Sequence, residues 1–154
     1  MPNEFRVNEK IIRLIVGFIT DLENMDGIVY YARPDLTLGT GFGTAISSQG
    51  GPKVQQELKK VGGAGITDVV VTGGGNLHAR YILHAVGPRF QEEDGEKKLR
   101  TTTLNTLRKA EEHQLQKIAF PAMGAGFYGI PLEVCARVTM GAVTEFLEKA
   151  AALK

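Results

Sequence analysis

The sequence is short of cysteine, of net charge and of long apolar runs. Its single cysteine, Cys135, excludes an internal disulfide and cannot form a zinc site alone, and this usage fits a reducing cytoplasm. The formal net charge of +1 argues against a nucleic-acid surface, because such affinity comes mostly from neutralising phosphates. No apolar run approaches the ~18 residues that span a membrane, and the first residues lack the basic start and apolar core of a signal peptide. We therefore expect a cytoplasmic protein without a membrane or nucleic-acid partner.

Glycine, in contrast, is abundant. The chain has 19 glycines in 154 residues, about 12% against a usual ~7%. They gather in five clusters, at 39–43, 50–51, 62–65, 73–75 and 124–129. Such clusters mark tight turns or places where the backbone approaches a ligand closely. The length predicts one domain over residues 1–154, large enough to bury its own core.

Strand and helix patterns alternate along the chain. The expected strands are 11–16, mostly buried and with 5–7 as an edge partner, then 27–31, 69–72, 81–86 and 117–120. The expected helices are 52–61, 99–113 and a last one that begins at Pro131. This alternation predicts an α/β sandwich around a central sheet. Within it, His84 and Cys135 are expected to be core residues rather than a ligand and a nucleophile.

Two of the glycine clusters follow strands: 39–43 comes after the buried strand 27–31, and 124–129 comes after the strand that ends at Phe120. Ligands of α/β sheets bind beyond the carboxyl ends of strands, where N–H groups of loops and helix starts favour negative charge. The second loop matches G-x-G-x-x-G, but one helix and then the chain end follow it, so a dinucleotide-binding fold is excluded. No Gly-Lys-Ser/Thr follows either loop, which excludes a P-loop. The loops predict a site for two adjacent phosphates; the alternative is that the glycines only make tight turns. No spacing suggests metal ligands, and no cofactor is expected.

The chain resembles a known family, the macro domain, from about Ile12 to Glu148. The resemblance rests on residues 16–22, both glycine loops, 76–88 and 118–122, of which 81–88 and 118–129 together are specific. It implies a three-layer α/β/α fold with a central mixed sheet and the binding of ADP-ribose; some members also hydrolyse ADP-ribose esters or O-acetyl-ADP-ribose. It implies that the loops 39–44 and 124–129 hold the diphosphate and the distal ribose, and that the Ile19 N–H meets the adenine. Gly126 is expected to leave no room for a side chain. The candidate ligand-binding residues are Phe18, Ile19, Arg33, Gly39, Thr40, Gly41, Phe42, Gly43, Thr44, Gly124, Ala125, Gly126, Phe127, Tyr128 and Gly129.

The chain also departs from the family pattern. Phe18 stands where the family has an aspartate that accepts from the adenine amino group. Arg33 stands in place of an asparagine of hydrolytic members, and Gly43 in place of their loop aspartate. Because the chain stops at Lys154, whether as a shortened chain or a natural short form, the family's last strand and helix are expected to be missing. No catalytic residue is assigned.

These features favour a binding module for ADP-ribose or a related nucleotide diphosphate, free or on an ADP-ribosylated protein. One alternative is a hydrolase of ADP-ribose derivatives, in which the ligand's own phosphate activates water. Another is a scaffold domain in which Phe18, Tyr30 and Tyr31 close the adenine end.

Overall fold

The computed structural model describes residues 3–39 and 41–154, apart from the side chain of Phe127. The strands are β1 (Glu4–Val7), β2 (Lys10–Arg13), β3 (Gly27–Tyr31), β4 (Val69–Gly73), β5 (Tyr81–Ala85) and β6 (Ile118–Ala119). The α-helices are α1 (Phe42–Gly50), α2 (Pro52–Val61), α3 (Gly95–Glu112) and α4 (Leu132–Leu147). Two single-turn 3-10 helices, η1 (Ile19–Asp21) and η2 (Gly126–Tyr128), complete the described elements. No helix among the described residues is long and apolar enough to cross a membrane.

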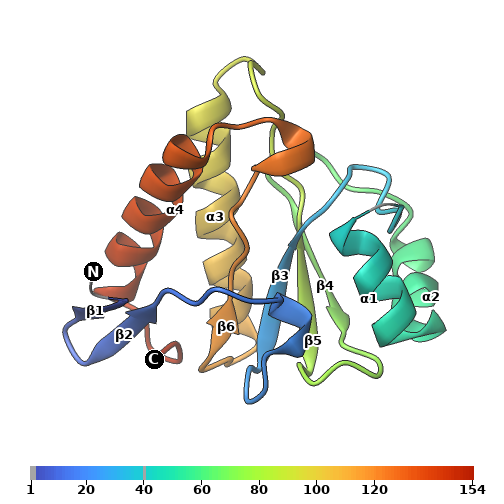
Figure 1. Ribbon diagram of the computed structural model, residues 1–154, viewed down its shortest axis with the longest axis horizontal. Helices are drawn as coiled ribbons and strands as arrows, with labels where there is room; N and C mark the ends of the chain where they lie inside the picture. The colour runs from blue at the N-terminus through green and yellow to red at the C-terminus, as the bar shows by residue number, and fades with distance from the viewer. Residues whose placement is uncertain (1–2, 40) are drawn as a thin grey trace.

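A mixed sheet in the order β4-β5-β3-β6 forms the central layer. Strand β3 runs parallel to both β5 and β6, whereas β4 runs antiparallel to β5. Helices α3 and α4 cover one face of the sheet, and α1 and α2 cover the other (Figure 1). The prediction of a three-layer α/β/α sandwich with a central mixed sheet is therefore confirmed.

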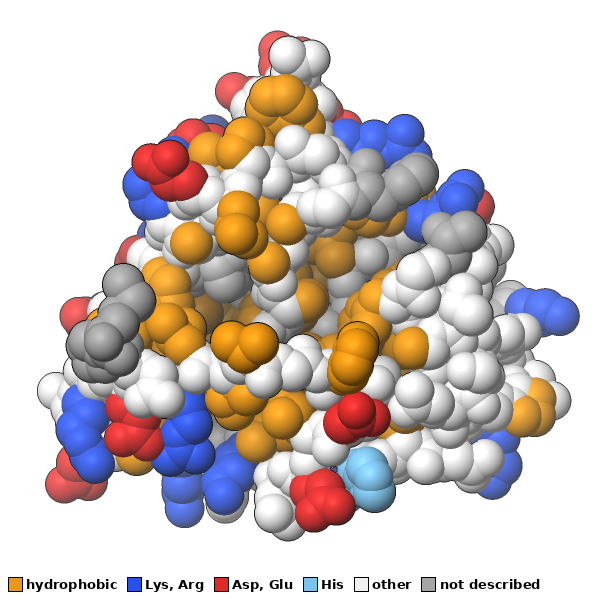
Figure 2. Space-filling view, in the orientation of Figure 1, with side chains coloured by type: hydrophobic (Ala, Val, Ile, Leu, Met, Phe, Trp, Pro, Cys, Tyr) orange, Lys and Arg blue, Asp and Glu red, His pale blue; other side chains and the backbone are white. Residues whose placement is uncertain are grey.

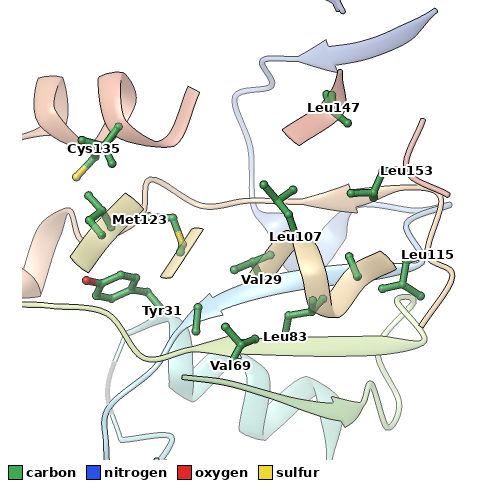
Figure 3. Packing of buried hydrophobic residues seen from close by; sticks show 14 of the residues in the cluster. Val29, Tyr31, Val69, Leu83, Leu107, Leu115, Met123, Cys135, Leu147 and Leu153 are labelled. Atoms are coloured by element: carbon green, nitrogen blue, oxygen red, sulfur yellow. The ribbon is translucent and has the colours of Figure 1, made fainter. Parts of the chain in front are cut away.

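Each face of the sheet has its own hydrophobic core. Because side chains alternate along a strand, neighbouring residues of β3 enter different cores. Val29 packs with Leu83, Leu107 and Met123 under α3 and α4 (Figure 3), whereas Ile28 belongs to the cluster with α1 and α2. All five side chains are at most 1% exposed. The predicted buried strand at 27–31 is confirmed, and so is the predicted strand at 81–86, which ends at Ala85.

The N-terminal hairpin stands apart from the sheet. Strands β1 and β2 pair antiparallel, with Phe5 opposite Ile12, so the predicted edge partner is confirmed. The expectation that the run 11–16 is a mostly buried strand is wrong. The strand ends at Arg13, and Leu14, Ile15 and Val16 are 48%, 55% and 105% exposed. Their β-branched pattern has the character of a core strand, but among the described residues no sheet strand lies beside them to bury them.

The two residues predicted to be core are confirmed as such. His84 is fully buried, and its Nε2 lies 2.9 Å from the hydroxyl of Thr72. Burial lowers the pKa of His84 to about 4, so the ring is neutral at pH 7. The Cys135 thiol is buried beside the carbonyl of Ile130, and burial raises its pKa. A thiol with a raised pKa is a poor nucleophile, because the thiolate is the reactive form.

Candidate functional site

A cleft of about 300 Å³ lies where the two predicted glycine loops meet. The first loop follows β3 and the second follows β6, and both leave the carboxyl ends of these parallel strands, at the top of Figure 1. The lining residues are Tyr30, Tyr31, Arg33, Gly39, Gly41, Phe42, Pro121, Ala122, Gly124, Ala125 and Tyr128. The structure thus brings together two segments about eighty positions apart, as the parallel pairing of neighbouring strands requires.

The first loop leads directly into a helix. Gly41 has a positive φ of +58°, a conformation that suits glycine, and its carbonyl accepts from the N–H groups of Thr44 and Ala45 at 3.0 and 3.4 Å. The N–H groups of Phe42 and Gly43 precede these first helical bonds, so the helix itself does not use them. Together with the helix dipole, they make this end of α1 suited to an anion.

The second loop depends on three glycines with positive φ. Gly124, Gly126 and Gly129 have φ values of +85°, +72° and +77°. The loop closes through the Ile130 N–H to the Gly124 carbonyl (3.0 Å) and the Gly129 N–H to the Gly126 carbonyl (2.9 Å). The sequence predicts no room for a side chain at Gly126, but a Cβ there would meet no atom of the described residues within 4 Å. The protein's own atoms therefore do not exclude a side chain at this position. Its positive φ is the reason for glycine at this position.

Aromatic side chains form the floor of the cleft. The Tyr30 and Phe42 rings lie 5.2 Å apart, and the Tyr31 and Tyr128 rings 4.7 Å apart, edge to face. The Tyr31 hydroxyl donates to the Pro88 carbonyl at 2.5 Å. Burial raises the pKa of Tyr30 to about 12 and that of Tyr31 further, so both hydroxyls stay neutral near pH 7. Sequence reasoning missed these tyrosines as part of a binding site; the signal was their place at the end of β3, next to a glycine loop.

Gly43 lies against this aromatic floor. A Cβ at Gly43 would lie 2.5 Å from the Tyr30 hydroxyl and 3.2 Å from the backbone of Leu38. Such contacts leave no space for a side chain without movement of the neighbours. Gly43 thus stands where the family resemblance gives hydrolytic members an aspartate, and Tyr30 occupies the adjoining space.

Of two arginines near the cleft, Arg33 lines it and Arg89 lies beside the lining residue Tyr128. Arg33 lines the cleft with a side chain that is 44% exposed, and its Nη2 lies 3.4 Å from the Asp35 carboxylate. Hydrogen bonds from the Thr37 N–H and hydroxyl, aided by Arg33, lower the pKa of Asp35. The Arg89 guanidinium lies 6.0 Å from the centre of the Tyr128 ring. Burial raises the pKa of Tyr128, and the charges of Arg33 and Arg89 oppose that rise.

The other predicted residues divide into three groups. Gly43, Thr44, Gly126 and Gly129 belong to the two loops but do not line the cleft. Phe18 and Ile19 lie before β3 and are not part of the lining either; Phe18 is 78% exposed and Ile19 is half-buried beside the core under α1. Thr40 and the side chain of Phe127 lie outside the described residues. Among the residues that are described, no group of three His, Cys, Asp or Glu side chains could hold a metal ion.

The fold and the cleft define a class of protein: an α/β/α domain in which two glycine loops at neighbouring strand ends line one cleft. Sequence comparison gives the family. The model of the family described as Macro domain matches residues 32–139, more than half of the chain, and the chain belongs to that family.

Relatives and solved structures of similar extent agree with this assignment. The chain is 39% identical over 143 residues to the macro domain-containing protein TTE0995 of Caldanaerobacter subterraneus, covering 89% of this chain and 81% of the relative. Its fold matches the Oceanobacillus iheyensis macrodomain solved with ADP at a TM-score of 0.91 and 28% identity, over 97% of this chain and 84% of that one. A mutant of the same macrodomain with ADPR also gives a TM-score of 0.91, at 26% identity over 97% and 86% of the two chains.

Proposed function

We propose that this protein is a binding module for ADP-ribose or a related nucleotide diphosphate, free or attached to a protein. The observation that carries the proposal is the convergence of two glycine loops and Arg33 on one cleft. Backbone N–H groups at the start of α1 and in the second loop would hold the two phosphates. The neighbouring structures with ADP and ADPR support this choice of ligand.

The rest of the ligand would extend from the two loops. We place the distal ribose over the aromatic floor of Tyr31 and Tyr128, where apolar ring faces suit a sugar. The adenine would lie toward Phe18 and Ile19, before β3. Phe18 offers an apolar ring that any base can stack on, because every base has a π-face.

Binding without hydrolysis is the activity that we propose. Gly43 has no side chain to act as a base, and the hydroxyl of Tyr30 lies in the adjoining space. Tyr30 itself has a pKa raised to about 12 by burial, too high for a general base at neutral pH. Arg33 only donates hydrogen bonds and keeps its charge, so it would stabilise the ligand phosphates in the ground state.

Calorimetric titration with ADP-ribose, ADP, AMP and NAD tests the proposal. We expect Gly126→Glu to abolish binding of ADP-ribose, because it adds bulk and negative charge to the phosphate loop. Gly62→Glu is the matched control. Gly62 also has a positive φ (+85°) and open space around it, but it lies at the C-terminal end of α2 and is not among the residues that line the cleft. Equal affinities of the two variants would remove the second loop from the site.

Mass analysis of the incubated ligand separates the alternatives. Binding of ADP-ribose without any change in O-acetyl-ADP-ribose or an ADP-ribosylated protein supports the binding module. Steady turnover would make the protein a hydrolase. Failure of every ligand to bind would leave the scaffold interpretation.

We also propose a cytoplasmic location. The buried, unpaired thiol of Cys135 supports a reducing compartment, where single cysteines persist as thiols. Fractionation of cells that produce the protein at its natural level would test it, and recovery with the membrane or the secreted fraction would contradict it.

A further inference from the structure

The Tyr30 hydroxyl fills the space beside Gly43 in the ligand cleft. A Cβ at Gly43 would lie 2.5 Å from that hydroxyl oxygen. From standard bond lengths, an aspartate carries its own carboxylate oxygens ~2.4 Å from its Cβ. The hydroxyl of Tyr30 therefore lies at the distance from position 43 at which an oxygen of the family's loop aspartate would lie. Strand β3 thus supplies, from a different segment of the chain, an oxygen atom that the first turn of α1 lacks.

Neighbouring rings hold this hydroxyl in place. Tyr30 lies directly opposite His84 in the parallel pair of β3 and β5. Its ring packs edge to face with His84, at 6.0 Å between centroids, and against Phe42 at 5.2 Å. The His84 ring is itself fixed by its contact with the Thr72 hydroxyl. The side chain of Tyr30 is therefore set before a ligand enters, and its hydroxyl proton can still rotate toward a partner.

Tyr30 brings to the cleft a group that can both donate and accept a hydrogen bond. It is one of the lining residues, and Figure 2 shows hydrophobic side chains, a class that includes tyrosine there, at the bottom of a hollow on this face. The Arg33 guanidinium only donates, and the Tyr31 hydroxyl already donates to the Pro88 carbonyl. A ribose hydroxyl both donates and accepts, so it needs an acceptor that Arg33 cannot supply. The neutral hydroxyl of Tyr30 can supply it.

We propose that Tyr30 is the residue by which this protein selects ADP-ribose over ADP, because its hydroxyl hydrogen-bonds a hydroxyl of the distal ribose. The inference rests on the proposed function, which places that ribose over the neighbouring Tyr31. Esters of ADP-ribose carry their acyl group on the distal ribose, so the loop aspartate of hydrolytic members belongs beside that sugar. Tyr30 keeps an oxygen at that place but replaces an anionic acceptor with a neutral hydroxyl. Recognition of the ribose is thereby kept without a carboxylate base.

Calorimetric titration of Tyr30→Phe with ADP-ribose and with ADP tests the inference. The two ligands share the adenosine and the diphosphate, and only ADP-ribose has the distal ribose. We expect the Kd for ADP-ribose to rise about three- to tenfold, the loss of one neutral hydrogen bond, and the Kd for ADP to stay within about twofold. Tyr81→Phe is the matched control. It makes the same change in β5, outside the cleft lining, and should alter neither Kd.

The outcomes separate this inference from the proposed function. Failure of the unmodified protein to bind either ligand would overturn both. If the unmodified protein binds ADP-ribose, and Tyr30→Phe binds it equally well, only the role of Tyr30 is overturned. The same conclusion follows if Tyr30→Phe weakens the binding of ADP as much as that of ADP-ribose, because the hydroxyl would then serve the diphosphate.

An exchange of residues provides a second test. Gly43→Asp should lower the melting temperature of the protein, because the Tyr30 hydroxyl occupies the space that the new side chain needs. In a Tyr30→Leu background that space is free, so the same change should cost less stability and should restore part of the preference for ADP-ribose that Tyr30→Leu loses. An equal loss of melting temperature in both backgrounds, or a double variant that prefers ADP-ribose no more than Tyr30→Leu does, would overturn the exchange.

Discussion

Arg33→Ala is the change that measures the electrostatic part of ligand binding. The guanidinium lines the cleft between the two glycine loops, and 3.4 Å to Asp35 is a long contact that leaves most of its donors for a phosphate. A hydrogen bond to a charged group contributes about 1.5–3 kcal/mol when well formed. The Arg33 side chain is 44% exposed, so solvent screening reduces this value. We expect a loss of about 1–2 kcal/mol in binding free energy, a factor of roughly 5–30 in Kd.

Calorimetry at two salt concentrations provides the assay. Salt screens the attraction between exposed charges, with a Debye length of about 10 Å at 0.1 M. Because Arg33→Ala has one charge fewer to be screened, the salt dependence of its Kd should be smaller than that of the unmodified protein. Asp35→Asn should strengthen binding a few-fold, because it removes a carboxylate that competes for the guanidinium.

Arg100→Ala is the matched control. Arg100 is 41% exposed, pairs with Glu145 between α3 and α4, and does not line the cleft, so its removal should leave the Kd unchanged. The reasoning is refuted if Arg33→Ala binds ADP-ribose as tightly as Arg100→Ala does, which is the result expected of a side chain that points to solvent.

Three further predictions concern the cleft floor, the core and the base. Gly43→Ala should destabilise the fold by about 1–3 kcal/mol through the clash with the Tyr30 hydroxyl, and a thermal melt of the double variant with Tyr30→Phe should show a smaller loss. The pKa of His84 is lowered to about 4 by burial, so between pH 6.5 and 4 the unfolded chain binds a proton that the folded chain does not. Stability should therefore fall as the pH drops through that window, by up to about 3 kcal/mol, and urea titrations of His84→Gln should lack this dependence. Because Phe18 cannot accept from the adenine amino group, competition binding should place ADP-ribose and its inosine analogue within about tenfold, or 1.4 kcal/mol; a hundredfold preference for adenine would contradict this.

The sequence predicted the inner strands of the sheet correctly, but it did not predict the exposure of the run 11–16. Runs such as 27–31 and 81–86 are apolar on both faces, and helices on both sides bury them, so composition and outcome agree. The run 11–16 has the same β-branched composition, but burial depends on what lies beside a strand. Nothing in the run itself shows that Leu14 and Val16 are exposed.

The site was predictable in its backbone and less so in its side chains. Glycine clusters after strands predicted both loops, because positive φ and close approach restrict the choice of residue. The roles of Tyr30 and Tyr31 depend on contacts with Gly43 and Pro88, which lie far from one another in sequence. The direction of Arg33 depends on local hydrogen bonds around Asp35 that spacing alone does not reveal.

The position of β3 in the middle of the sheet has a consequence for biosynthesis. Gly27 pairs with Tyr81 on one side and with Ile118 on the other, so both neighbours of this early strand come much later in the chain. Non-local parallel pairing makes folding slow, because long loops must close before any contact forms. While the ribosome still holds the second half of the chain, the apolar strand β3 has neither partner. Nascent chains should therefore expose it for most of translation and depend on chaperones until β6 emerges.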